Sequence, residues 1–204
     1  MSTATSPRFK NLQELYNAAR ICMPCPFGKT EKDHKVFGEG DPSALVMLIG
    51  EAPGAEEDRL KRPFVGRSGK LIDTLLHASG HVRSEVFITN VVKCRPPGNR
   101  TPLPNEITDN MKALLKEEIM LIKPKVICTL GSVATQIFFK EPIAISQVRG
   151  KPIRFINPNV VVIPTFHPAY VLRNQKAEIL LSSDLKLAFE LAENTQTEMS
   201  NSAL

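Results

Sequence analysis

Two short motifs carry side chains that could do chemistry, and each directly follows an apolar run. Residues 50–54 read Gly-Glu-Ala-Pro-Gly and follow the apolar residues 45–49, whereas residues 167–170 read His-Pro-Ala-Tyr and follow the largely apolar residues 160–166. If both runs are parallel strands of one sheet, the motifs meet at its carboxyl edge, where open α/β sheets bind their ligands. We therefore expect one pocket lined by a carboxyl group, a Gly/Pro turn and a lone imidazole.

Three of the four cysteines have a pattern that suits a metal centre. Cys22 and Cys25 form a CxxC pair on a Pro- and Gly-rich loop, and Cys94 precedes a second Pro-rich loop. The pair follows a helix rather than the strand-to-helix turn of a redox motif, which favours metal binding. A structural zinc ion and an iron–sulfur cluster both remain open. Cys128 lies inside an apolar run and is expected to be a small buried hydrophobe.

Apolar strands alternate with amphipathic helices along the chain. This order predicts a three-layer α/β/α fold around a mostly parallel four-stranded central sheet. A basic segment around Gly150 is expected to be a turn between two short strands. Strands are expected at 45–49, 86–92, 126–130 and 160–163, and helices at 11–20, 69–78, 105–122 (capped by Asn105), 131–139 and 178–191.

Length and composition indicate one globular domain. With 204 residues, 42% of them hydrophobic and 23% charged, the chain can bury a sizeable core. We expect a single domain from 9 to 193, with disordered tails at 1–8 and 194–204. No apolar run is long enough to cross a bilayer and no signal peptide is recognisable, so we expect a cytoplasmic protein that binds no membrane. The net charge of +5 favours a polyanionic partner.

Segment 62–70 superficially suggests a P-loop, but it lacks the spacing and the preceding strand that such a loop needs. Asn90, by contrast, lies in an apolar strand and must find hydrogen bonds if it is buried.

The ordered set of motifs resembles the family 4 uracil-DNA glycosylases, the iron–sulfur branch of that superfamily. The resemblance runs from about Cys22 to Arg173 and rests on residues 51–54, 64–66, 89–90, 93–97 and 167–170.

The resemblance implies an enzyme of base excision repair. Such an enzyme flips uracil out of single- or double-stranded DNA and hydrolyses its N-glycosidic bond, leaving an abasic site. By match to the family, Phe64 stacks on the flipped ring, and Asn90 donates to uracil O4 and accepts from N3–H. His167 donates to uracil O2, while Glu51 shapes the pocket through its backbone and orients water or the sugar. A monomer is expected, because one flipped base needs one pocket.

Other matched positions imply contacts around the base and along the DNA. Glu57 corresponds to the residue near uracil C5 that would exclude the thymine methyl. Ala52 replaces the acidic, water-activating residue of some other branches, so a dissociative reaction is expected. Leu172 or Arg173 would fill the vacated base stack. Phosphate contacts are expected from Ser68, Gly69, Lys70 and Arg149.

The match fails at one metal ligand. The family holds a [4Fe–4S] cluster with four cysteines, and the fourth position here is Asn110. Three outcomes remain: a cluster held by Cys22, Cys25, Cys94 and a non-thiolate ligand such as Asp109 or Asn110; a degraded or three-iron cluster; or no metal. The first is favoured. Two rival functions follow, a catalytically weak nucleic-acid-binding homologue with an impaired metal site and a zinc-stabilised hydrolase acting on another nucleobase or nucleotide.

Overall fold

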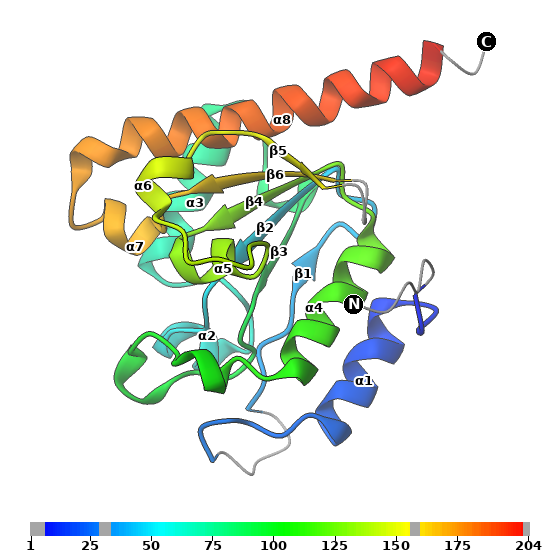
Figure 1. Ribbon diagram of the computed structural model, residues 1–204, viewed down its shortest axis with the longest axis vertical. Coiled ribbons are helices and arrows are strands. Elements are labelled where there is room, and N and C mark those ends of the chain that lie inside the picture. Colours follow the sequence, from blue (N-terminus) through cyan, green and yellow to red (C-terminus); the bar gives the residue numbers. More distant parts are fainter. Residues whose placement is uncertain (1–6, 29–33, 156–159, 202–204) are drawn as a thin grey trace.

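The computed structural model describes residues 7–28, 34–155 and 160–201, with side chains up to residue 194. Its centre is a six-stranded sheet in the order β1-β3-β2-β4-β6-β5 (Figure 1). The four inner strands are parallel, and the two edge strands are antiparallel to their neighbours. The strands are β1 (Glu39–Gly40), β2 (Val46–Gly50), β3 (Val86–Asn90), β4 (Val126–Leu130), β5 (Ile153–Phe155) and β6 (Val160–Thr165).

The four predicted strands are confirmed as the parallel centre, but the expected count of four strands was too low. The edge strands β1 and β5 are only two and three residues long. Such short segments have no periodicity that a sequence pattern can reveal. The segment around Gly150 leads into β5, which is the short strand expected after it, but it follows a helical turn at 145–148 where a second short strand was expected.

The helices complete two outer layers around the sheet. Helix α4 begins after Thr108, whose side chain accepts a hydrogen bond from the Met111 N–H, so the predicted cap at Asn105 was wrong. Asn105 instead lies in a 3₁₀ turn. Helix α5 ends before the predicted Phe139, and α8 extends beyond the predicted Leu191. The α-helices are α1 (Leu12–Cys22), α2 (Ala55–Leu60), α3 (Arg67–Ala78), α4 (Asp109–Ile122), α5 (Ser132–Gln136), α6 (Ile145–Val148), α7 (Pro168–Val171) and α8 (Glu178–Asn201).

The expected tails lie partly outside the described part of the chain. Residues 1–6 and 202–204 are not described, and 194–201 continue α8. Among the residues that the structure does describe, no helix combines the length and apolar character that a membrane crossing needs.

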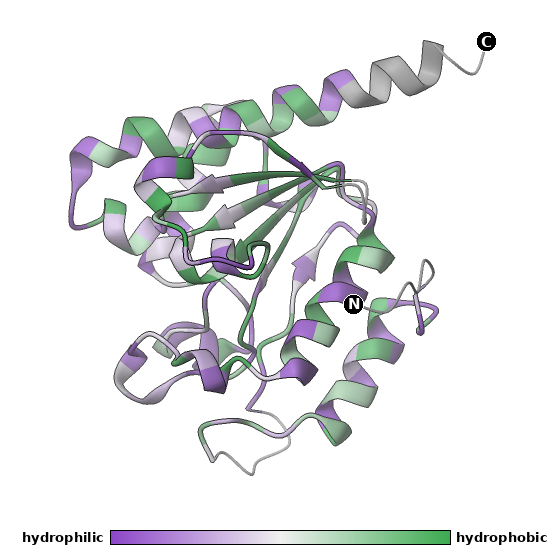
Figure 2. Cartoon of the chain, in the orientation of Figure 1, coloured by the Kyte–Doolittle hydropathy of each residue, from purple (hydrophilic) through white to green (hydrophobic). Residues whose placement is uncertain are grey.

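Alternate residues of each inner strand face opposite layers, and this places the core. Met47 and Ile49 of β2 pack in the cluster that includes α1 and α4, whereas Val46 and Leu48 pack in the cluster that includes α3 and α8. Figure 2 shows the inner strands as an apolar centre between more polar outer helices. Burial on both faces explains why these strands are continuous apolar runs rather than alternating ones. The three-layer α/β/α prediction is confirmed.

The sheet register brings the two chemistry-bearing motifs to one edge. Gly50 of β2 lies beside Asn90 of β3, and Leu130 of β4 lies beside Thr165 of β6. Because these strands are parallel, their carboxyl ends share an edge, and the turns that follow them begin there. The segment after Gly50 and the segment containing His167 therefore start from the same edge, as the sequence predicts.

Candidate active site

A cleft of about 540 Å³ opens at this carboxyl edge. All six predicted catalytic and substrate-binding residues line it: Glu51, Ala52, Glu57, Phe64, Asn90 and His167. They come from the end of β2, helix α2, the loop before α3, the end of β3 and the start of α7. The sheet thus gathers an amide, an imidazole, an aromatic ring and a carboxyl group that are far apart in sequence.

The imidazole of His167 is held in a defined tautomer. His167 is the N-cap of α7, and its Nδ1 accepts a hydrogen bond from the Ala169 N–H at 3.1 Å. An accepting Nδ1 carries no proton, so the neutral ring carries its proton on Nε2. Burial, together with the Arg173 charge, lowers the pKa of His167 to about 4, and Glu57 opposes this shift. The ring is therefore a neutral Nε2–H donor at physiological pH.

Asn90 offers a buried hydrogen-bonding group to the cleft. Its side chain is at the end of β3, and the residue is only 2% exposed. Within the described residues, its Oδ1 has no hydrogen-bond partner. An unpaired buried acceptor is costly in free energy, so such a group in a cleft is suited to a ligand that supplies an N–H donor.

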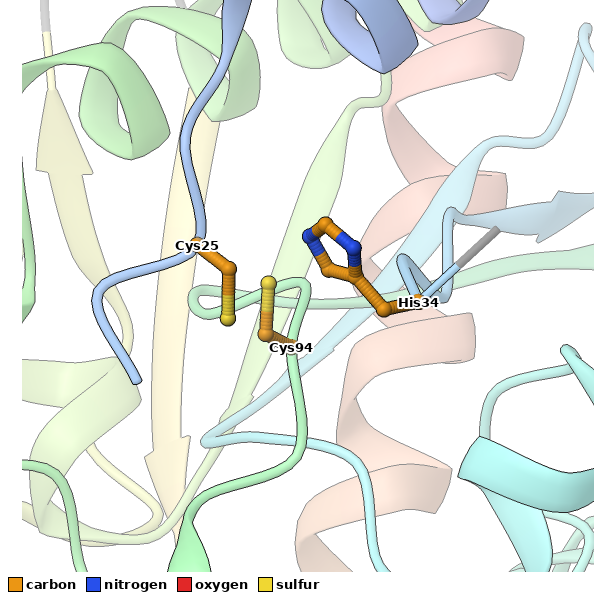
Figure 3. Close-up of side chains that lie close together, drawn as sticks. All are labelled: Cys25, His34 and Cys94. Atoms are coloured by element: carbon orange, nitrogen blue, oxygen red, sulfur yellow. The ribbon is translucent and has the colours of Figure 1, made fainter. Parts of the chain in front are cut away.

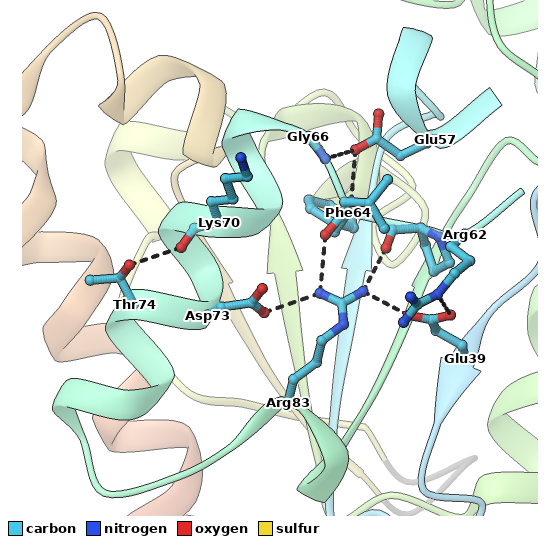
Figure 4. A network of polar contacts seen from close by, with 11 residues as sticks. Glu39, Glu57, Arg62, Phe64, Gly66, Lys70, Asp73, Thr74 and Arg83 are labelled. Carbon is cyan, nitrogen blue, oxygen red and sulfur yellow. Dashed lines mark hydrogen bonds and ion pairs between the residues drawn. The ribbon is translucent and has the colours of Figure 1, made fainter. Parts of the chain in front are cut away.

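Phe64 reaches the cleft through an unusual backbone conformation. Its φ is +51°, a left-handed value that a bulky residue rarely adopts, and its ring centroid lies 6.1 Å from that of His167. Arg83 Nη1 donates to the Phe64 carbonyl at 3.1 Å, and Nη2 donates to the Pro63 carbonyl at 2.6 Å (Figure 4). A Cβ built on Gly69 would lie 1.7 Å from the Phe64 carbonyl oxygen, so only glycine permits this approach.

Glu57 clamps the loops around Phe64. Its carboxylate accepts hydrogen bonds from the Gly54 N–H at 3.1 Å, the Val65 N–H at 2.9 Å and the Gly66 N–H at 2.7 Å. Figure 4 shows this carboxylate turned towards the segment that carries Phe64. The three bonds tie the start of α2 to the loop before α3. Contact of Glu57 with uracil C5 stays a prediction.

Glu51 is half-buried at the cleft wall. Burial raises the pKa of its carboxyl group, and a hydrogen bond with the Thr101 side chain opposes the rise. Its backbone carbonyl accepts the Val92 N–H at 3.0 Å, which continues the pairing of β2 with the chain after β3. Glu51 is therefore anchored through its backbone, and Thr101 is a contact that the sequence did not indicate.

The predicted DNA-binding residues fall into two groups. Ser68, in the first turn of α3, and the exposed Arg173 line the cleft, as Tyr170 does. Lys70 is exposed, and Leu172 is half-buried at the end of α7. Arg149 forms an ion pair with Asp184, and its Nε donates to the Asp184 carboxylate at 3.1 Å. A phosphate contact by Arg149 would therefore compete with this ion pair.

Only two of the four predicted metal ligands, Cys25 and Cys94, are grouped in the structure, and a histidine lies with them. Cys25, Cys94 and His34 bring their ligand atoms within 4.8 Å of one another (Figure 3). Cys22 is the exposed last residue of α1, so it does not lie on the loop as predicted. Asn110 is exposed in the first turn of α4. His34 was not among the predicted ligands, and its distance from the CxxC pair does not match the usual spacing of Cys/His metal sites.

Cys128 is fully buried in β4, as predicted, and burial raises the pKa of its thiol.

A buried ion pair, which the sequence did not indicate, lies beside the strand end that carries Asn90. Lys93 Nζ donates to the Glu118 carboxylate at 2.8 Å, and both side chains are 0% exposed. Lys93 Nζ also donates to the Asn90 backbone carbonyl at 2.7 Å. The pair thus supports the strand end that carries Asn90.

The sequence of this chain is similar to those of a known family of proteins. The sequence model of the Uracil DNA glycosylase superfamily matches residues 37–190, which include all six strands. A type-4 uracil-DNA glycosylase of Thermotoga maritima is 45% identical over 159 residues, 78% of this chain and 81% of that protein. One from Sulfurisphaera tokodaii is 40% identical over 189 residues, 89% of this chain and 85% of that protein.

One further relative is more distant. A type-5 uracil-DNA glycosylase of Thermus thermophilus is 34% identical over 115 residues, 50% of this chain and 52% of that protein. The type-4 proteins match at higher identity and over a larger share of the chain. This chain belongs to the uracil DNA glycosylase superfamily and, within it, to the type-4 uracil-DNA glycosylases.

Proposed function

We propose that this protein excises uracil from DNA at the cleft beneath His167 and Asn90. The observation that carries the proposal is the pairing of two complementary groups in one cavity. One is the buried, unpartnered Asn90 Oδ1, and the other is the neutral His167 Nε2–H donor. Uracil presents an N3–H donor and two carbonyl acceptors, so its polar edge fits this combination.

Base selection follows from the polarity of the Asn90 amide. With Oδ1 accepting from N3–H and Nδ2 donating to O4, uracil satisfies both ends of the amide. Cytosine has an N3 acceptor and an N4 donor, so both contacts become mismatched. A buried polar site rejects such a ligand through its unpaired groups rather than through size.

Asn90→Ala should lower kcat/KM for uracil excision by about tenfold to a hundredfold, because lost hydrogen bonds to a buried base cost about 1–3 kcal/mol. Asn17→Ala, at an exposed position of α1, is the matched control and should leave kcat/KM unchanged. Steady-state assays on a strand with one uracil measure both values. Equal kcat/KM for Asn90→Ala and wild type would contradict the assigned role.

The chemistry proposed for the cleft is departure of the uracil anion followed by capture of water. Negative charge develops on uracil O2 as the glycosidic bond breaks, and the His167 Nε2–H is a preorganised donor for that oxygen. Ala52 has no group that can accept a proton. The Glu57 carboxylate already accepts three backbone hydrogen bonds. Glu51 orients the water or the sugar after bond breaking has begun.

The His167 tautomer gives a pH prediction. An NMR titration should show a midpoint near pH 4 rather than 6.5 and an Nε2–H tautomer at pH 7. The unfolded chain then binds more protons than the folded one between these values, so stability should fall as the pH drops from 6.5 towards 4. His167→Ala should lose that part of the slope. A midpoint at 6.5 would contradict the assigned environment.

DNA is held, in this proposal, by groups at the cleft rim. Backbone N–H groups near Ser68 and Gly69, in the first turn of α3, suit phosphate oxygens, and Lys70 adds a charge. Leu172 or Arg173 enters the space left by the flipped base. The protein would act as a monomer on single- or double-stranded DNA in the cytoplasm.

A resident iron–sulfur cluster belongs to the same proposal. The donor chemistry of Cys25, His34 and Cys94 fits a metal centre, because two thiols and an imidazole lie within 4.8 Å of one another. Such a centre would stabilise the loops around Cys94 and thereby the DNA-binding face. No role in breaking the glycosidic bond is assigned to it.

A substrate panel tests the function. Oligonucleotides that are identical except for one uracil, thymine or cytosine should be incubated with the protein and then treated with alkali, which cleaves abasic sites. We expect cleavage of the uracil strand only. Uncut uracil strands would instead support the rival reading as a weak nucleic-acid-binding homologue, and cleavage of the cytosine strand would contradict the role of Asn90.

A further inference from the structure

The fourth ligand position of the expected cluster has no thiol, and a buried histidine lies beside the ligands that remain. His34 is 4% exposed, and its ring nitrogen lies within 4.8 Å of the Cys25 and Cys94 sulfurs. Asn110, at that fourth position, is exposed in the first turn of α4. We propose that His34 replaces the missing cysteine, so that three thiolates and one imidazole hold the metal centre.

Backbone pairing fixes His34 next to Cys94. Lys35 forms an antiparallel bridge with Cys94, and the Val36 N–H donates to the Lys93 carbonyl at 2.7 Å. The segment that carries His34 therefore runs alongside the segment that carries Cys94. Figure 3 shows the His34 ring pointing towards the Cys25 and Cys94 side chains, and the three residues come from three separate segments of the chain. The position of the imidazole is thus built into the backbone.

The end of α1 is tied to the same segment, and Cys22 at that end is the third thiolate of the proposal. Lys35 is buried, and its Nζ donates to the Arg20 carbonyl in the last turn of α1 at 3.2 Å. Cys22 ends that helix, and the CxxC spacing leads from it directly to Cys25. Cys22 is exposed and lies outside the group of Cys25, His34 and Cys94 in the structure, so the proposal requires the helix end to bring its sulfur to the other three donors.

The chemistry of the donors favours His34 over Asn110. Thiolates and imidazoles are the ligands that zinc and iron–sulfur centres use, whereas a neutral amide oxygen suits hard ions such as calcium. Both zinc and iron–sulfur centres accept a mixed set of cysteine and histidine. In an iron–sulfur centre, a neutral imidazole in place of a thiolate also raises the reduction potential.

Metal content tests this proposal without any measurement of glycosylase activity. The protein should be purified without oxygen, and iron, zinc and acid-labile sulfide should be measured per chain. Metal-free protein should also be reloaded in two arms, with ferrous iron plus sulfide and with zinc alone. We expect one arm to give a stable centre in wild type and at least a fivefold lower metal content in His34→Ala. His34→Cys should restore the content, with an altered visible spectrum if iron is bound.

Two matched variants and a direct probe complete the test. Asn110→Ala and His77→Ala, both at exposed positions, should retain the wild-type metal content. Wild type should show nitrogen hyperfine coupling if the centre is reduced iron–sulfur, or a nitrogen scatterer in X-ray absorption if it is zinc. That nitrogen signal should change or vanish in the His34 variants and persist in Asn110→Ala and His77→Ala. Should His34→Ala fail to fold, the wild-type and His34→Cys spectra still decide. Full metal content and an unchanged spectrum in His34→Ala would overturn the proposal.

This proposal depends on the proposed function only in the kind of cluster that it expects. If the protein excises uracil but its metal content does not depend on His34, the ligand assignment is wrong and the proposed function remains. If its metal content depends on His34 but it excises no uracil, the proposed function is wrong and the ligand assignment remains.

Discussion

His167→Ala should lower kcat for uracil excision by about 10²–10³-fold, or about 3–4 kcal/mol of transition-state stabilisation. The Nε2–H of His167 is oriented before the reaction by the bond between Nδ1 and the Ala169 N–H. A preorganised donor meets the developing charge on uracil O2 without reorganisation at the moment of bond breaking. Because that charge exists mainly in the transition state, kcat should fall more than KM rises.

The exposed His77 provides the matched control for this histidine. His77→Ala should excise uracil at the wild-type rate, since its side chain lies on the outer part of α3. Single-turnover assays on a strand with one uracil measure the chemical step directly. A His167→Ala rate within threefold of wild type would show that leaving-group stabilisation comes from another residue.

Glu118→Ala should lower the free energy of unfolding by about 3–5 kcal/mol, because it leaves the buried Lys93 ammonium without a counter-charge. Both side chains are fully buried, and Glu118 also accepts a hydrogen bond from the Tyr16 hydroxyl at 2.8 Å. Desolvation lowers the pKa of Lys93, and the Glu118 carboxylate opposes that shift. Denaturant titration monitored by circular dichroism gives the change.

An exposed pair on α8 provides the comparison. Glu190 lies 3.8 Å from Lys186, and both side chains are more than half exposed. Glu190→Ala should therefore change stability by less than about 1 kcal/mol. A double variant, Lys93→Met with Glu118→Leu, should recover much of the loss of Glu118→Ala, since no buried charge remains. Equal stability of Glu118→Ala and Glu190→Ala would contradict the buried pair.

The sequence was sufficient for the parts of the fold that have a strong pattern. The four inner strands are apolar because both of their faces are buried, and such runs are visible without a structure. The meeting of the Glu51 and His167 motifs followed from parallel pairing alone. The edge strand β1 escaped detection because pairing with a neighbour, rather than its own composition, makes it a strand, whereas β5 is the short strand expected after Gly150.

Long-range contacts explain what the sequence could not predict. Asn105 and Thr108 are both good helix caps, and the Met111 N–H hydrogen bond decides between them only in the folded chain. His34 is brought to Cys94 by the pairing of Lys35 with a segment far along the chain. Glu118 is on an amphipathic helix, where a carboxylate is usually solvated, and only its burial against Lys93 gives it a structural role.

Single-turnover release of free uracil measures the excision that we assign to Asn90 and His167. A DNA strand with one uracil should be mixed with excess wild-type protein or with the double variant Asn90→Ala/His167→Ala, and the released base should be identified by mass. We expect stoichiometric uracil and an abasic strand with wild type, and almost no release with a double variant that remains folded. Release at the wild-type rate by the folded double variant, or none by wild type, would contradict it.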